Sequence, residues 1–238
     1  MGLSREAPRH RGVICVSGLG GGVGEWAGVA VSLTRLGELT TLELPAGVHS
    51  ENGHGDPLAA GRQLVEGELH RGRRDSLVLI GHSMGALAAM LAVTAEPHRV
   101  AGLVLTAPFL PVARDGRSKL TTAADYLRHR VLFIAATPRR RRSPARSLTP
   151  SQRVASLRSL AHYGLRPAAF HARADAISCP VLLVHGDSDH YVPPAFALGA
   201  AHRHPAWQLA LIRGAGHFPH RDAPQAWLAA VEPWLDQL

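Results

Sequence analysis

The chain has 238 residues, of which 46% are hydrophobic, and a formal net charge of +8. This length and apolar content predict one compact domain with a large core and exclude a largely disordered chain. Two cysteines, Cys15 and Cys179, are too few for a disulfide framework and favour a reducing compartment. The sequence shows no signal-peptide pattern and no apolar run of membrane-spanning length, so we expect a cytoplasmic protein without a membrane span.

Short apolar runs alternate with helical patterns along most of the chain. Runs of β-branched and aliphatic residues predict strands at 12–17, 39–44, 77–80, 100–106, 180–185 and 207–212. Apolar spacing and composition predict helices at 25–36, 57–70, 86–93, 194–202 and 223–235. Because strands that alternate with helices usually pair in parallel, the sequence predicts a doubly wound α/β fold with a mostly parallel sheet of about six strands.

The segment 108–178 interrupts this alternation. It is long and helical in composition, and it holds fourteen Lys or Arg residues but only three acidic ones. We expect a helical, Arg-rich cap inserted into a core formed by residues 1–107 and 179–238. A charge confined to one segment is a local surface property, so we do not expect a nucleic-acid-binding protein. Since 25 of the 26 basic residues are Arg, a coding bias towards Arg would also explain this positive charge.

Residues 81–85, Gly-His-Ser-Met-Gly, join the predicted strand 77–80 to the helix that follows. Only a cramped turn can make so short a connection, and glycines at 81 and 85 remove side chains that would collide across it. The Ser83 hydroxyl would then stand exposed at the carboxyl end of the strand. The Met84 N–H, in the first helical turn, would point to the same place.

This stretch resembles the Gly-x-Ser-x-Gly nucleophile motif of the α/β-hydrolase family, and two later loops resemble the same family. Residues 186–193 follow its Gly-x-x-Asp-x-x-x-Pro pattern, which selects Asp189 and leaves Asp187 as a competitor. Residues 214–217 resemble its Gly-x-Gly-His stretch, which selects His217. The resemblance therefore implies Ser83 as nucleophile, His217 as base and Asp189 as acid, in the family's chain order. We expect the nearby His220 to face solvent.

The resemblance also implies where the remaining parts of the site lie. The oxyanion donors would be the N–H of Met84 and that of Leu19, or of Gly20 if the register of the turn 17–20 shifts by one residue. Aromatic and apolar residues could line an acyl pocket or form plain core: Phe109, Leu110, Phe133 and Tyr163. The run Arg139–Arg142 could receive an acidic group such as an acyl-carrier protein, or could be a solvated loop.

We therefore expect a serine hydrolase, with no cofactor and no metal, that cleaves a small-molecule carboxylic ester or thioester through an acyl-enzyme. Residues 81–86 also resemble a segment of biosynthetic thioesterases. The same triad could instead serve acyl transfer, elimination or cyclisation, and a non-catalytic ligand binder is a further alternative. Residues 22–27, Gly-Val-Gly-Glu-Trp-Ala, with Glu43 would suit a dinucleotide-binding protein.

Overall fold

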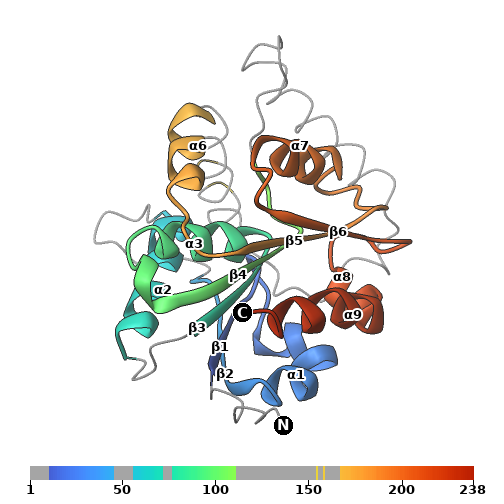
Figure 1. The fold of residues 1–238 in the computed structure, drawn as a ribbon, viewed down its shortest axis with the longest axis horizontal. Coiled ribbons are helices and arrows are strands. Elements are labelled where there is room, and N and C mark those ends of the chain that lie inside the picture. The colour runs from blue at the N-terminus through green and yellow to red at the C-terminus, as the bar shows by residue number, and fades with distance from the viewer. Residues whose placement is uncertain (1–10, 46–55, 72–76, 111–153, 155–157, 159–166) are drawn as a thin grey trace, which may run out of the picture.

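The computed structural model describes residues 11–45, 56–71, 77–110, 154, 158 and 167–238. Its strands form a six-stranded sheet in the order β2-β1-β3-β4-β5-β6, and every neighbouring pair is parallel (Figure 1). The predicted fold class, a doubly wound and mostly parallel sheet of about six strands, is confirmed. The strands are β1 (Arg11–Val16), β2 (Gly37–Leu42), β3 (Leu77–His82), β4 (Val100–Thr106), β5 (Val181–Gly186) and β6 (Gln208–Ile212).

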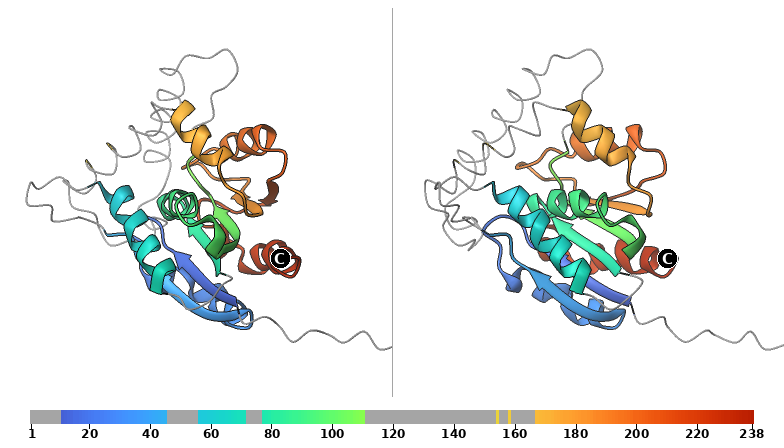
Figure 2. Two further views of the ribbon diagram at one scale, coloured as in Figure 1. Left: turned by 60° about the vertical axis from the view of Figure 1, so that its left-hand side comes forward. Right: turned by 90° about the vertical axis from the view of Figure 1, so that its left-hand side faces the viewer.

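Helices cover both faces of the sheet (Figures 1 and 2). One face carries α2 (Pro57–Arg71) and α3 (Met84–Val93), and the other carries α1 (Ala27–Thr34) and α9 (Pro224–Leu235). The remaining helical elements are η1 (Val23–Trp26), η2 (Pro97–Arg99), α6 (Pro167–Asp175), α7 (Ala195–Arg203) and α8 (Pro219–Asp222).

The central strands are buried on both sides, which explains their unbroken apolar sequence. Along β3, Leu77 and Leu79 join the core layer that includes α2 and α3, while Val78 and Ile80 join the layer that includes α1 and α9. Because all six strands are parallel, their carboxyl ends lie at one edge of the sheet. The loops that follow β1, β3, β5 and β6 therefore meet there, and functional sites of such sheets form at this edge.

The turn between β3 and α3 is as tight as the sequence predicts. Ser83 has φ of 53° and ψ of −118°, a left-handed backbone conformation that costs a non-glycine residue about 1–3 kcal/mol. A Cβ atom on Gly81 would lie 2.4 Å from Ala86 Cα, and one on Gly85 would lie 2.4 Å from Ser17 O. Only glycine lets the chain pass at these two points, so this turn and the end of β1 can pack together.

Much of the predicted cap lies outside the described residues, including Phe133, Tyr163 and the run Arg139–Arg142; α6 is the described helix within it. The cap therefore stays a prediction. None of the helices that the structure describes is long and apolar enough to span a membrane. Cys15 is a buried free thiol and Cys179 a partly buried one.

The two turn glycines give the first prediction. We expect Gly81→Ala and Gly85→Ala each to lower the free energy of unfolding by about 1–3 kcal/mol or more, because the added methyl group meets backbone atoms that cannot rotate away. Urea unfolding monitored by circular dichroism measures the change. Gly24→Ala is the matched control, since a Cβ atom there has no neighbour within 4 Å. Equal stability of all three variants would contradict the tight turn.

Candidate active site

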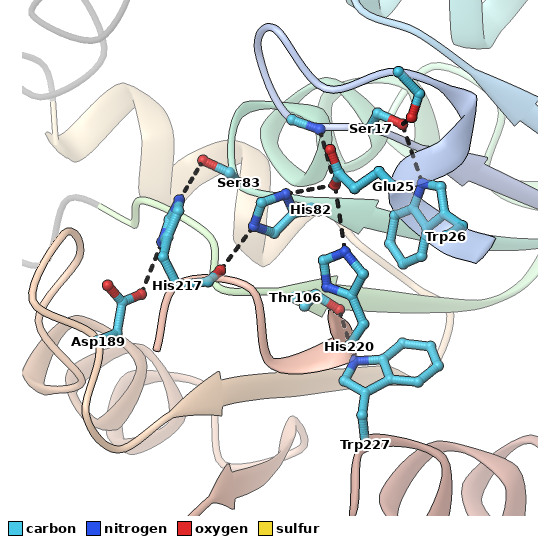
Figure 3. A network of polar contacts seen from close by, with 12 residues as sticks. Ser17, Glu25, Trp26, His82, Ser83, Thr106, Asp189, His217, His220 and Trp227 are labelled. Carbon is cyan, nitrogen blue, oxygen red and sulfur yellow. Dashed lines mark hydrogen bonds and ion pairs between the residues drawn. The ribbon is translucent and has the colours of Figure 1, made fainter. Parts of the chain in front are cut away.

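Three side chains from distant parts of the chain converge at the carboxyl edge of the sheet (Figure 3). Ser83 follows β3, Asp189 follows β5 and His217 follows β6. His217 Nε2 lies 3.1 Å from Ser83 Oγ, and His217 Nδ1 lies 2.8 Å from Asp189 Oδ2. The structure thus brings together all three residues that the motifs selected, in a geometry that lets the imidazole bridge the hydroxyl and the carboxylate.

Asp189 is held by its own loop. Its Oδ1 accepts hydrogen bonds from the N–H groups of Tyr191 at 2.7 Å and Val192 at 2.9 Å. Burial alone would raise the pKa of the Asp189 carboxyl, but its interactions with His217 and His185 outweigh it and hold that pKa well below its ordinary value. The carboxylate is therefore ionised at neutral pH.

His185, at the end of β5, is a contributor that the motifs did not reveal. It is fully buried, and its Nε2 lies 2.8 Å from Val192 O and 3.3 Å from Asp189 Oδ2. One N–H there can serve both the loop carbonyl and the carboxylate, so His185 ties the Asp189 loop to the strand that precedes it.

The competing acid, Asp187, has a different position. It is exposed, and its Oδ1 accepts hydrogen bonds from Gly214 N at 2.7 Å and from Ser188 Oγ at 2.9 Å. Asp187 thus braces the loop after β5 against the loop after β6. The structure places Asp189, and not Asp187, beside His217.

The environment of His217 keeps the imidazole neutral. Burial lowers the pKa of His217 and Asp189 opposes that shift, but the net direction is downward. A neutral ring that donates Nδ1–H to Asp189 leaves Nε2 as an acceptor for the Ser83 hydroxyl proton. The Tyr191 ring packs 4.6 Å from the imidazole, centroid to centroid, and limits its rotation.

The turn after β1 lies directly beside Ser83. A Cβ atom on Gly18 would lie 2.8 Å from His82 Nδ1 and 3.4 Å from Ser83 Cβ, so Gly18, the neighbour of Leu19 in the chain, lies against the Ser83 turn. Gly20 has φ of 73°, a left-handed conformation that favours glycine. Met84 begins α3, and the first N–H groups of a helix have no carbonyl one turn earlier to bind. The donors proposed for an oxyanion thus come from segments that border the Ser83 side chain.

The predicted pocket residues are only partly within the described chain. Phe109 and Leu110, just after β4, are buried in the core layer that includes α2 and α3. The Phe109 ring lies 5.5 Å from that of Phe196 on α7, centroid to centroid. Phe133 and Tyr163 lie outside the described residues. A substrate-binding role for these four residues stays a prediction.

A second buried polar cluster, formed by Glu25, His82 and His220, lies behind the Ser83 turn (Figure 3). Glu25 Oε1 lies 2.7 Å from His82 Nδ1 and 3.5 Å from His220 Nε2. On the opposite side of its ring, His82 Nε2 donates a hydrogen bond to the backbone carbonyl of His217 at 2.8 Å. The cluster therefore connects η1, the end of β3 and α8 with the loop that carries His217.

The expectation that His220 faces solvent is wrong. Its side chain is 0% exposed and stacks on the Trp26 indole at a centroid distance of 4.4 Å. The short helix α8 turns the chain inward before α9 begins, so the side chain at 220 packs against η1. Burial lowers the pKa of His220 to about 4, even though Glu25 opposes that shift, so this ring is neutral at pH 7.

Among the described residues, this cluster also comes close to a metal-ligand arrangement, with one potential ligand atom from each residue and all within 4.8 Å of one another. Ligands of a tetrahedral zinc, bound at 2.0–2.1 Å, stand roughly 3.3 Å apart. The 2.7 Å between Glu25 Oε1 and His82 Nδ1 is shorter and matches a shared proton. We therefore interpret the cluster as a network of polar contacts.

The glycine-rich stretch that would suit a dinucleotide has its side chains engaged elsewhere. Glu43 Oε1 accepts a hydrogen bond from Val23 N at 2.8 Å, so this carboxylate binds the turn itself. Glu25, within the same stretch, points inward to His82. Both carboxylates thus stabilise the turn after β1 and its contact with β3.

Comparison with known proteins relates this chain to hydrolases. The chain is 26% identical over 230 residues to a proposed carbamate hydrolase, RutD, of Klebsiella pneumoniae, covering 86% of this chain and 84% of that protein. A thermophilic esterase from Thermogutta terrifontis superposes with a TM-score of 0.69 at 22% identity, covering 95% of this chain and 90% of the other.

The thioesterase domain of the curacin biosynthetic pathway superposes with a TM-score of 0.64 at 20% identity, covering 98% of this chain and 93% of that domain. At this identity the two structural likenesses show a shared fold. The model of the alpha/beta hydrolase family matches residues 13–231. Because this match spans most of the chain, the protein belongs to the alpha/beta hydrolase family.

Proposed function

We propose that this protein is a serine hydrolase that cleaves a carboxylic ester or thioester through an acyl-enzyme intermediate on Ser83. The observation that carries the proposal is the continuous line of contacts from Ser83 Oγ to His217, at 3.1 Å, and from His217 to Asp189, at 2.8 Å. Membership of the alpha/beta hydrolase family supports hydrolase activity. The names of the compared proteins, which include an esterase and a thioesterase, favour an acyl substrate.

In the first step, Ser83 Oγ forms a bond to the substrate carbonyl carbon while its proton passes to His217 Nε2. Asp189 stabilises the imidazolium that results and keeps Nδ1–H pointed toward itself. The negative charge on the carbonyl oxygen is stabilised by the N–H groups of Met84 and Leu19. The bond to the leaving oxygen or sulfur then breaks, and His217 returns the proton to it. Water, deprotonated by His217, releases the acid in the second half of the reaction.

The carbamate hydrolase among the relatives suggests a third substrate class for testing. A carbamate offers the same kind of carbonyl carbon to Ser83, but its nitrogen makes that carbon less electrophilic. Esters, thioesters and carbamates should therefore be compared in one panel. Acyl transfer, elimination and cyclisation would use the same residues with another acceptor in place of water, and analysis of the released product separates them from hydrolysis.

The nucleophile is tested by covalent labelling. We expect a fluorophosphonate probe to label the wild-type protein once per chain and to leave Ser83→Ala unlabelled, because the probe captures only an activated serine. Intact-protein mass spectrometry measures the label, and turnover of p-nitrophenyl esters of increasing chain length measures the activity. A folded Ser83→Ala variant that still hydrolyses these esters would contradict the proposal.

The acid is tested by a matched pair of variants. We expect Asp189→Asn to lower kcat on the best ester by about 10³–10⁴-fold, because an amide no longer selects the tautomer of His217 that accepts the serine proton. Asp187→Asn should change kcat by less than about tenfold, since its oxygen can still accept the hydrogen bond from Gly214 N. If the two variants lose activity equally, the assignment of Asp189 is wrong.

The base gives a prediction for the pH profile. Since His217 acts as a neutral base and burial lowers its pKa, kcat/KM should stay level as the pH falls and decline only below the ordinary histidine value of 6.5. Steady-state kinetics between pH 4.5 and about pH 8 measures the midpoint of this decline. A midpoint above 6.5 would show that Asp189 outweighs burial, and would contradict the predicted direction.

A further inference from the structure

The proton arrangement around His82 points to a role for Glu25. Both ring nitrogens of His82 face oxygen atoms: Nε2 lies 2.8 Å from the carbonyl of His217, and Nδ1 lies 2.7 Å from Glu25 Oε1 (Figure 3). A carbonyl oxygen only accepts, so Nε2 carries a proton. An unprotonated Nδ1 and a carboxylate would repel each other at 2.7 Å, so one further proton lies between this ring and Glu25.

Glu25 offers this ring an ionised oxygen. Burial alone would raise the pKa of the Glu25 carboxyl, but the neighbouring His82 and His220 outweigh it and place that pKa below its ordinary value. His220, the third member of the cluster, is neutral at pH 7. The Glu25 carboxylate thus faces His82 Nδ1 while His82 Nε2 binds the loop that carries His217.

We propose that Glu25 is a positioning residue of the hydrolase site, which holds the His82 ring so that its Nε2–H fixes the backbone of His217 in register with Ser83. This inference rests on the proposed function and adds a contact to it. His82 is the neighbour of Ser83 in the chain, whereas His217 follows β6, which is separated from β3 by β4 and β5. The bond from His82 to the His217 carbonyl thus fixes the loop of the base relative to the nucleophile.

The energetics favour a functional reason for this pair. His82 is 1% exposed and Glu25 is 6% exposed, and burying such a pair contributes little net stability because both side chains lose their hydration. Where water is excluded, however, the polar contacts that Glu25 and His82 make are strong and directional. A displacement of about 1 Å at a reacting group can cost on the order of 100-fold in rate, so a rigid hold on the base has a large effect on turnover.

The test combines Glu25→Gln with a matched control, Glu43→Gln. Both replace a carboxylate by an amide of the same shape near the turn after β1, but Glu43 binds Val23 N and does not contact His82. We expect Glu25→Gln to lower kcat by about tenfold with little change in KM, because the reacting groups lose their alignment while the substrate still binds. Glu43→Gln should leave both within about twofold. Titration with a fluorophosphonate probe corrects kcat for the fraction of active sites.

A loss of active sites with an unchanged kcat for each remaining active site would mean that Glu25 only stabilises the fold, and would overturn the proposal. A second measurement requires no turnover: ¹⁵N NMR of the histidine rings in the folded Ser83→Ala protein should show a proton on His82 Nε2. A His82 ring whose Nε2 carries no proton would overturn the proposal, as would stoichiometric zinc binding at this cluster. Failure of the proposed function is distinct, because it would appear as absent Ser83-dependent labelling in the wild-type protein.

Discussion

The backbone conformation of Ser83 is the constraint on which the site depends. With φ of 53° and ψ of −118°, the residue turns the chain from β3 into α3 without an intervening loop. Its N–H donates to Thr106 O at 2.9 Å, so β4 holds the strained residue in place. The cost of about 1–3 kcal/mol is offset by the surroundings, because β3 and α3 are buried along their whole length. A serine on a flexible loop would lack this fixed direction toward His217.

Two buried carboxylates act on His217 from opposite sides. Asp189 contacts the imidazole ring, while Glu25 reaches the backbone of the same residue through His82. The pKa of each carboxyl lies below its ordinary value despite burial, because each has a histidine beside it. Each carboxylate is therefore available as a permanent hydrogen-bond acceptor at neutral pH. The ring and the main chain of the base are thus controlled by separate contacts.

The sequence predicted well those features that are local or that recur in a fixed order. Strands buried on both faces appear as unbroken apolar runs, and the three loops of the proposed triad carry short motifs at strand ends. The position of His220 was misjudged because its contact with Glu25 joins residues 195 positions apart, and neither helical nor strand periodicity encodes such a pairing. The inward turn at α8 is only four residues long, too short to leave a periodic pattern. The edge strand β2 begins and ends two residues earlier than predicted, since its half-buried side chains mark its limits poorly.

The position of His82 in the chain explains why a contact there can matter for chemistry. Adjacent residues, His82 and Ser83, bind the two ends of one residue: the carbonyl of His217 and its Nε2 atom. Any small shift of β3 therefore moves Ser83 and the anchor of His217 together. The distance from Oγ to Nε2 is then insensitive to motion between strands, whereas a base anchored only through Asp189 would move with β5. Two contacts between the same pair of segments define both a distance and an orientation, and proton transfer between Ser83 and His217 requires both.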